Sequence, residues 1–317
     1  MKNMKKLLCM LLALSMVLAL CACGSSTEEA ATTTEAPAEE AAATEAPAEE
    51  ATEEVDYSAM SLDELKAVLT TVTEGKLTVA TSPDFAPYEF YAIGEDGTPQ
   101  LAGFDIALAG YIADYLGLEL EVIPVDFDGV LNELAAGNVD LGMAGLSPDP
   151  TRMDAMDFSD IYYQGGQSFV TVQDKVDLFP DLESANNPEY SIGAQNGSIQ
   201  MDLANEYTPD ADIIALVKVT DIIAELMGDK LDGAFIETAV AENYAVSYPE
   251  LAVILDVPYD VEGSSVGVVK GNAALLAGVN MAIAAAIEDG SMDTFVAEAN
   301  ELSTGEIIEG LLDDQAA

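Results

Sequence analysis

The stretch Gly103–Gly145, GFDIALAGYIADYLGLELEVIPVDFDGVLNELAAGNVDLGMAG, decides the fold of this 317-residue chain. Its first part carries apolar residues at helical spacing and reaches Gly117, a residue type that commonly ends a helix. Residues 118–124 alternate as strands do, 128–137 have the pattern of a helix closed by glycine, and 139–145 are typical of another strand. Strands and helices that alternate at this spacing predict a parallel sheet with right-handed crossovers.

The alternation extends in both directions. Upstream, the capping-box sequence at residues 61–64 predicts a helix to about Val72, and a strand is expected at 77–81. Downstream, strands are expected at 168–172, 191–195, 213–217, 232–236, 251–255 and 264–270, and helices after Gly197-Ser198, from a cap at Thr220, and over 238–248, 273–287 and 292–302.

The folded part is expected to form two lobes, because about 240 residues exceed what one open α/β core usually holds. The strand pattern breaks near residues 165–169 and again near 258–264, and the chain is expected to cross between lobes there. The predicted division gives residues 59–166 and 264–312 to lobe 1, residues 167–263 to lobe 2, and residues 313–317 to a tail.

The N-terminus has the layout of a secretory signal. Three lysines precede an apolar run over residues 7–20, which is too short to span a bilayer comfortably. The sequence Leu20-Cys21-Ala22-Cys23 resembles the lipobox of bacterial lipoproteins, and this resemblance implies that residues 1–22 are removed and that Cys23 is lipidated. The alternative is an ordinary secretion signal with incidental cysteines.

Residues 23–58 are expected to be a disordered tether. TEAPAEEAAA from Thr34 is followed by TEAPAEEATE from Thr44, a near-repeat that is poor in large apolar residues and rich in like charges. Such a composition cannot bury enough apolar surface to offset its ordering entropy, and its charges extend it. A tether of this kind after a lipid anchor holds a domain away from the membrane surface.

The charge excludes one large class of partners. The whole chain carries a formal charge of −48, and loss of residues 1–22, with their three lysines and no acid, makes it −51. Nucleic acid is excluded as a partner, since binding it depends on neutralising phosphates with Lys and Arg. A basic membrane-binding patch is excluded on the same ground.

The residue inventory narrows the chemistry. There is no His, and Cys9, Cys21 and Cys23 all lie in the N-terminal segment, so nucleophilic triads and His- or Cys-based zinc sites cannot be built in the exported body. Residues 126–129 mimic part of a calcium loop, but Pro124 would occupy the first ligand position. No cofactor or metal is expected, while acid–base chemistry by carboxylates stays open.

Arg152 is the only arginine in the chain, against 58 acidic residues. Its planar guanidinium can bind a carboxylate or phosphate through two parallel hydrogen bonds, which lysine cannot do. The alternative is a local ion pair of little energetic weight, because Asp149, Asp154 and Asp157 are close in sequence.

From about Lys76 to Leu302 the chain resembles the solute-binding proteins of bacterial polar-amino-acid ABC importers, the family 3 extracellular solute-binding proteins. The motifs that carry the resemblance, in chain order, are TSPDFAPYEF, GFDIALA, DFDGVLNELAAGNVDLGMAGLSPDPTRMDAMDFSDIYY, GAQNGSIQ and LDGAFIE. The resemblance implies a two-lobed α/β fold of the type II periplasmic-binding-protein kind, each lobe a mostly parallel sheet flanked by helices. It also implies capture of a free amino acid for a membrane permease, and no catalysis.

The resemblance further implies roles for individual residues. Arg152 would hold the α-carboxylate of the ligand, with further donors from Ser147 and from the Ala144-Gly145 backbone. The Ser198 amide would reach the same carboxylate from the other lobe, and Glu237, where relatives commonly have Asp, would hold the α-ammonium. Two aromatic residues would enclose the ligand side chain, and Ser82 would line its pocket. The predicted ligand-binding set is Ser82, Phe85, Phe127, Ala144, Gly145, Ser147, Arg152, Ser198 and Glu237.

Several of these positions have a structural alternative. Phe85 and Phe127 could be ordinary core residues, Glu237 could cap the helix expected from Thr238, and Ser147 could stabilise the turn before proline. The functional interpretation is favoured because the residues converge with Arg152 on one resemblance.

The ligand side chain is the least readable feature. Ser82 stands where binders of basic amino acids often carry Asp, and Ile199 replaces a frequent Thr, which favours a neutral amino acid, while Asp84 keeps a cationic one open. The expected location is the extracytoplasmic face of the membrane, lipid-anchored, as a monomer that delivers to an ABC permease. Two rival functions are a cyclohexadienyl-dehydratase-like enzyme on the same fold and a sensor domain.

Overall fold

The computed structural model describes residues 55–94, 97–260 and 263–303. They lie in the second of the two units into which the chain separates, which begins at Glu54. The predicted signal segment, Cys23, most of the tether and the predicted tail lie outside the described residues. Tyr57–Ala59 form a 3₁₀ turn, η1, whose first residues are capped by the Asp56 side chain.

One five-stranded sheet has the order β4-β1-β5-β12-β6. Its strands are β1 (Lys76–Thr81), β4 (Glu119–Pro124), β5 (Leu141–Gly142), β6 (Met156–Tyr163) and β12 (Ser264–Val269). β1 is parallel to both β4 and β5, which confirms the parallel arrangement predicted from residues 103–145, while β12 is antiparallel to β5 and β6. Its helices are α2 (Leu62–Val68), α3 (Phe104–Leu116), α4 (Phe127–Ala135), α9 (Ala273–Glu288) and α10 (Ser291–Ser303).

A second five-stranded sheet has the order β11-β7-β10-β8-β9. Its strands are β7 (Gln167–Val172), β8 (Ser191–Gln195), β9 (Asp212–Leu216), β10 (Gly233–Glu237) and β11 (Leu251–Asp256). β8 is parallel to β9 and β10, and β7 is antiparallel to β10 and β11. The elements packed against it are η3 (Gln173–Leu178), α5 (Leu182–Ala185), α6 (Ile199–Tyr207), α7 (Val219–Met227) and α8 (Thr238–Ser247).

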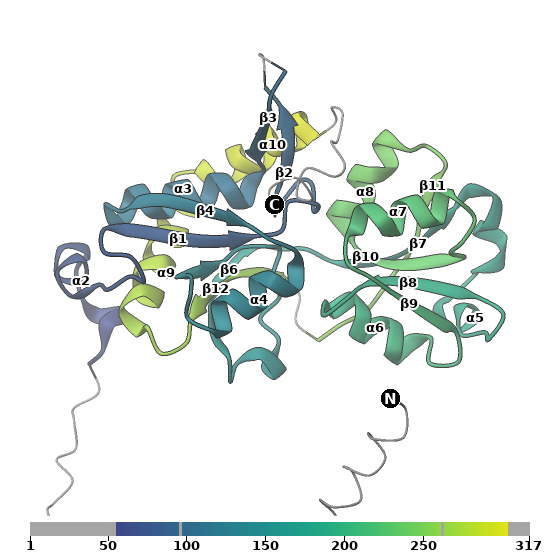
Figure 1. Cartoon of the computed structure of the whole chain (residues 1–317), viewed down its shortest axis with the longest axis horizontal. Helices are drawn as coiled ribbons and strands as arrows, with labels where there is room; N and C mark the ends of the chain where they lie inside the picture. The colour runs from purple at the N-terminus through teal and green to yellow at the C-terminus, as the bar shows by residue number, and fades with distance from the viewer. Residues whose placement is uncertain (1–54, 95–96, 261–262, 304–317) are drawn as a thin grey trace, which may run out of the picture. The chain divides into compact units, whose positions relative to one another are not determined.

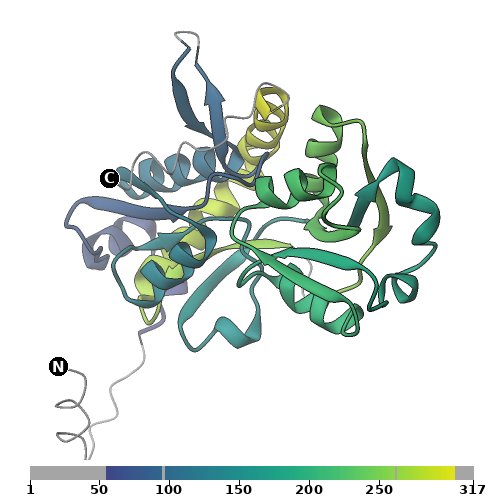
Figure 2. The same ribbon diagram turned by 45° about the vertical axis from the view of Figure 1, so that its right-hand side comes forward.

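The chain leaves the first sheet after β6 and rejoins it at β12, so the strands of the second sheet are inserted between β6 and β12 of the first (Figure 1). In Figure 2, too, the strands of the second sheet and those of the first form two separate groups of elements. The lobe boundaries given above remain a prediction.

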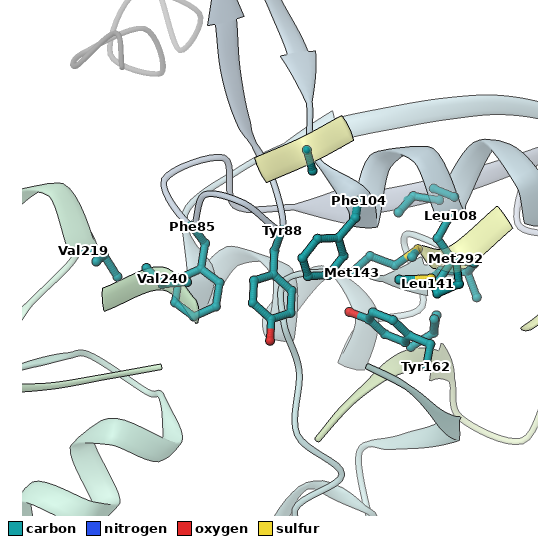
Figure 3. Close-up of a cluster of buried hydrophobic side chains, with 14 of the residues drawn as sticks. Phe85, Tyr88, Phe104, Leu108, Leu141, Met143, Tyr162, Val219, Val240 and Met292 are labelled. Atoms are coloured by element: carbon teal, nitrogen blue, oxygen red, sulfur yellow. The ribbon is translucent and has the colours of Figure 1, made fainter. Parts of the chain in front are cut away.

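Buried apolar side chains connect the two sheets. One cluster joins Phe85, Tyr88 and Phe104 to Val219 and Val240, which belong to helices of the second sheet (Figure 3). The rings of Phe85 and Tyr88 are 5.3 Å apart, and those of Tyr88 and Phe104 are 4.3 Å apart. The loop after β1 is thus held by packing on both sides.

Local sequence signals set several boundaries as expected. The Ser61–Glu64 capping box is present, although α2 ends at Val68 rather than near Val72. Gly117 ends α3 in the left-handed conformation, with φ of 73°. The two-residue strand β5 is shorter than the predicted 139–145, because the chain turns away at Gly145, where φ is 56°.

Other elements differ from the sequence expectation. α7 begins at Val219, so the predicted cap at Thr220 is wrong; the Asp84 side chain, distant in sequence, accepts the Val219 N–H instead. The strands β2 (Phe90–Ile93) and β3 (Pro99–Ala102), which form a hairpin, and the strand β6 were not expected from the sequence. No single helix among the described residues is long and apolar enough to cross a membrane; α9 and α10 meet that test only as a pair bent by 78°.

Candidate ligand-binding site

The predicted site residues all follow carboxyl ends of parallel strands, where α/β proteins commonly bind ligands. On the first sheet Ser82 and Phe85 follow β1, Phe127 follows β4, and Ala144, Gly145, Ser147 and Arg152 follow β5; on the second sheet Ser198 follows β8 and Glu237 ends β10. Gly145 and Arg152 are partly exposed, and the other seven are buried.

Arg152 reaches across to the second sheet. Its Nη2 donates a 3.0 Å hydrogen bond to the carbonyl oxygen of Gly197, next to Ser198, and its Cζ lies 5.8 Å from the centre of the Phe127 ring. Burial lowers the pKa of the guanidinium, an effect opposed by the charges of Asp149 and Asp202. The side chain of Arg152 therefore lies between the strand-end loops of the first sheet and those of the second.

The local ion pair considered for Arg152 is not found. Among the described residues no carboxylate pairs with it within 4.0 Å. Asp149 instead caps the 3₁₀ turn η2 (Pro150–Arg152) through Thr151 N–H, and Asp157 pairs with Lys270 at 2.7 Å. The one arginine of the chain is thus left available for an anionic ligand group.

Glu237 caps α8, as its structural alternative expected, and its role toward a ligand ammonium stays a prediction. Its Oε2 accepts a 2.9 Å hydrogen bond from Val240 N–H and caps α8, while its Oε1 accepts one of 3.1 Å from the Tyr88 hydroxyl. The side chain is 3% exposed, and burial raises the pKa of Glu237 to about 7. A Cβ at Gly165 would lie 2.7 Å from Oε1, so the glycine leaves room for this carboxylate.

The loop after β5 packs against Phe85. A Cβ at Gly145 would lie 2.7 Å from Phe85 Cε1, so only glycine permits this approach. The Gly145 N–H donates to Asp105 Oδ2 at 3.1 Å in the ligand-free structure, and the predicted backbone donor to the ligand stays a prediction. Ser147 is buried, and its hydroxyl has no hydrogen-bond partner in the part of the chain that the structure describes.

Ser198 stabilises the loop between β8 and α6 on the second sheet. Its hydroxyl donates to the Gln195 carbonyl at 2.7 Å and accepts from Met201 N–H at 3.3 Å, which caps α6. Its own N–H donates to the same Gln195 carbonyl at 3.3 Å, a long bond that a ligand carboxylate could replace. The predicted amide contact remains a prediction.

The side chain of Asp84, on the loop after β1 of the first sheet, also bonds residues of the second sheet. Its Oδ1 accepts from Ser82 Oγ at 2.9 Å, and its Oδ2 accepts from Val219 N–H at 2.7 Å and from Gln195 Nε2 at 3.4 Å. The hydroxyl of Tyr244 donates to its backbone carbonyl at 3.2 Å. Burial raises the pKa of Asp84 to about 6, although the bonds from Val219 and Ser82 lower it.

The sequence reasoning missed Tyr88, Asp105 and Asn196. Tyr88 bonds Glu237, Asp105 holds Gly145, and Asn196 Nδ2 donates to Asp128 Oδ2 across the two sheets. Tyr88 and Asp105 lie inside the motifs TSPDFAPYEF and GFDIALA, so their place in those motifs was the available signal. The described residues contain no group of three or more acidic, His or Cys side chains placed to hold a metal ion.

Two α/β sheets whose strand-end loops bond each other around an arginine and a buried acid define a two-lobed solute-binding protein. A family model agrees: residues 77–298 match the bacterial extracellular solute-binding proteins, family 3. The chain belongs to this family.

Similar proteins give the family a narrower context. The arginine-binding extracellular protein ArtP of Bacillus subtilis is 33% identical over 60% of this chain and 73% of its own. The crystal structure of the ABC transporter substrate-binding protein AbpA from Streptococcus pneumoniae, bound to L-arginine, matches with a TM-score of 0.70 at 29% identity, over 77% of this chain and all of that one. The cyclohexadienyl dehydratase of Pseudomonas aeruginosa is 27% identical over 57% of this chain and 66% of its own. Most of the relatives are thus binding proteins rather than enzymes.

Proposed function

We propose that this protein captures a free amino acid with a cationic side chain, arginine in the first place, and delivers it to the permease of an ABC importer. Support for the amino-acid class comes from ArtP, from AbpA with its bound L-arginine, and from the family match. Support for the cationic side chain comes from the charges of the site itself.

The charge balance of one partly exposed arginine and two buried acids carries this proposal. Arg152 has no carboxylate partner, and Glu237 and Asp84 have no basic partner among the described residues. A buried charge is costly unless an opposite charge compensates it. Arginine carries one carboxylate and two cationic groups, so it would compensate all three side chains, whereas a neutral amino acid would leave one acid without a partner.

Each ligand group has a place in this arrangement. The α-carboxylate would accept two parallel hydrogen bonds from the guanidinium of Arg152 and one from the free hydroxyl of Ser147. The α-ammonium would bind Glu237. The guanidinium would lie toward Asp84, between the rings of Phe85 and Phe127. This replaces the neutral preference drawn from Ser82 and Ile199, because Asp84 lies buried directly beside Ser82.

Capture would proceed by closure of the two lobes on the ligand. The contacts from Asp84 to Val219, from Tyr88 to Glu237 and from Arg152 to Gly197 already join loops of different sheets. A ligand that adds ion pairs on both sides would shift the population toward this joined arrangement and exclude water, which strengthens each pair. The closed form would then be the one that the permease recognises.

A thermal-shift and calorimetry panel tests the proposal. Purified protein is titrated with arginine, lysine, glutamine and glutamate, since a ligand bound only by the native state raises the melting temperature. Arginine should give the largest shift and the tightest binding, and glutamate none. Tighter binding of glutamine than of arginine would restore the neutral preference and overturn the cationic assignment.

An enzymatic reading on the same fold has one observation in its favour. Glu237, with a pKa near 7, would suit a general acid, as a dehydratase related to that of P. aeruginosa would need. Incubation with prephenate and arogenate, followed by chromatography of the products, tests it directly. Turnover that disappears in Glu237→Gln would support an enzyme, and no turnover alongside tight arginine binding would exclude it.

A further inference from the structure

Two fully buried carboxyl groups lie on adjoining segments beneath the ligand-binding loops. Glu89 lies just before β2, and Asp105 lies in the first turn of α3; both are 0% exposed. Asp105 N–H donates to the carbonyl of Tyr88, the residue before Glu89, and neither oxygen of the Glu89 carboxyl has a hydrogen-bond partner among the described residues. Ionised carboxylates only accept hydrogen bonds, so a hydrogen bond between these two neighbours requires a proton on one of them.

The surrounding donors indicate which group carries the proton. Asp105 Oδ1 accepts a 2.6 Å hydrogen bond from the Tyr162 hydroxyl, and its Oδ2 accepts the Gly145 N–H, both of which suit an ionised acceptor. Neither oxygen of Glu89 receives a donor from the described residues. The proton therefore belongs to Glu89, which donates it to Asp105.

The groups that face this pair would not stabilise a second negative charge. They are the carboxylate of Asp84 from the β1 loop and the hydroxyls of Tyr88 and Tyr162 from the same loop and from β6. No Lys or Arg among the described residues forms an ion pair with Glu89 or Asp105. Burial, with the charges of Asp105 and Asp84, raises the pKa of Glu89 well above its ordinary value.

The pair is joined to the ligand-binding loops through the backbone. Phe85 and Glu89 exchange backbone hydrogen bonds of 3.0 and 3.3 Å, and Asp105 N–H donates to the Tyr88 carbonyl at 2.9 Å. A Cβ at Gly103 would lie 2.1 Å from that same carbonyl oxygen, so glycine is required for α3 to dock here. Asp105 then holds Gly145, against which Phe85 packs.

We propose that Glu89 and Asp105 share one proton and act as a positioning pair, which fixes the Phe85 loop and the Ala144–Ser147 loop in register with each other. Neither residue contacts the ligand. Loss of the shared proton would place two negative charges side by side and loosen both loops. The part of this inference that concerns ligand affinity rests on the proposed arginine binding, but the shared proton does not.

The test compares Glu89→Gln, Glu89→Ala and the exposed control Glu74→Gln in the mature chain. Glutamine reproduces the protonated carboxyl, because its amide can donate to Asp105, while alanine cannot. Infrared difference spectra of the ligand-free protein, wild type minus variant at neutral pH, should contain a protonated-carboxyl C=O band for both Glu89 variants and none for Glu74→Gln; the partly protonated Glu237 contributes to every spectrum and cancels. Absence of that difference band for Glu89→Gln would overturn the shared proton.

Stability and affinity supply independent readouts. Wild-type stability should fall as pH rises above the ordinary range of Glu, because the folded state then binds a proton that the unfolded state has lost. Glu89→Gln should remove that part of the dependence and bind arginine within a few-fold of wild type, whereas Glu89→Ala should bind about tenfold more weakly.

Two outcomes would contradict the pair. The first is that Glu89→Gln loses as much stability or arginine affinity as Glu89→Ala does. The second is that a chelator lowers the stability of the wild type and a divalent cation restores it, which would mean that a cation and not a proton lies between the two carboxyl groups. If wild-type protein binds no arginine, the infrared and stability measurements still decide the shared proton, so the two proposals fail separately.

Discussion

The Asp84 carboxylate, on the loop after β1 of the first sheet, accepts a 2.7 Å hydrogen bond from the backbone N–H of Val219, the first residue of α7 on the second sheet. A side chain from the first sheet's loop thus caps a helix that packs on the second sheet, at the N-terminal end, where the helix dipole favours a negative charge. Even so, burial keeps the pKa of this acid raised to about 6, which indicates that its charge is incompletely compensated without a ligand.

Replacing Asp84 by Asn should therefore weaken arginine binding selectively. If the guanidinium pairs with this buried carboxylate, loss of the charge removes one partner of a buried ion pair, which costs about 3–5 kcal/mol, or roughly two to four decades of affinity. Glutamine, which has no side-chain charge, should lose less than about tenfold. Calorimetry with both ligands measures the difference, and the exposed Asp154→Asn serves as the control. Equal losses for arginine and glutamine would contradict the cationic assignment.

Arginine affinity should rise with pH through the range in which Glu237 ionises. The pKa of Glu237 is about 7 and that of Asp84 about 6 without ligand, and a bound cation favours the ionised form of each. Binding should therefore release protons near pH 6–7, and titrations in buffers of different ionisation enthalpy measure that release. Glu237→Gln should lose its share of the release; an affinity independent of pH between about 5 and 8 would contradict the ammonium role.

The ligand-free protein should show the opposite trend in stability. Since the folded pKa of Glu237 lies above its ordinary value of 4.5, its contribution is full below about pH 4.5 and is lost as pH rises through about 7, an effect of about 3 kcal/mol. Urea unfolding across this range checks it, with Glu237→Gln showing a flatter profile.

Much of the fold could be predicted from the sequence because its signals were local. The α3 pattern and its stop at Gly117 depend on residues within one helix, and so does the Ser61–Glu64 capping box. The start of α7 could not be predicted, because its cap comes from Asp84, 135 positions earlier. β6 was missed because an edge strand that pairs with β12 across register shifts has no regular alternation.

For the site, whose ligand contacts remain predictions, the sequence indicates candidate residues but not the bonds that they make. Phe127 and Glu237 were expected beside strand ends, and the structure has Phe127 after β4 and Glu237 at the end of β10. Their partners, such as Tyr88 for Glu237 and Gly197 for Arg152, lie 149 and 45 positions away, and only the tertiary fold determines them.

Gly145→Ala should reduce both stability and arginine affinity. The new Cβ would meet Phe85 at 2.7 Å and would sit at a φ of +56°, which strains any other residue by about 1–3 kcal/mol. Gly75→Ala is a matched control, since its φ is +79° and nothing lies within 4 Å of its Cβ position. Gly75→Ala should lower the stability but leave the arginine affinity unchanged. Unchanged arginine affinity in Gly145→Ala would mean that the Phe85 contact does not shape the site.

Cys23 should carry the lipid anchor. Cys23→Ser is expected to move the protein from the membrane fraction into the medium, while Cys21→Ser should leave it anchored, because the lipobox resemblance assigns the lipid to Cys23 alone. Intact-mass spectrometry identifies the modified residue and the cleavage point. A soluble wild-type chain cut elsewhere, with Cys23 unmodified, would contradict the anchor.

The central claim is that Arg152 binds the α-carboxylate of the ligand, and calorimetry of Arg152→Ala with arginine tests it most directly. Truncating one partner of a buried charge pair costs about 3–5 kcal/mol, so affinity should fall by roughly two to four decades, with Arg152→Lys recovering only part of it. Lys76→Ala, which removes a cation paired with Glu121 at the start of β1, the strand end opposite to the loop with Ser82 and Phe85, should change affinity little. Circular dichroism must show each variant folded. Arginine affinity of folded Arg152→Ala within a few-fold of wild type would contradict the account.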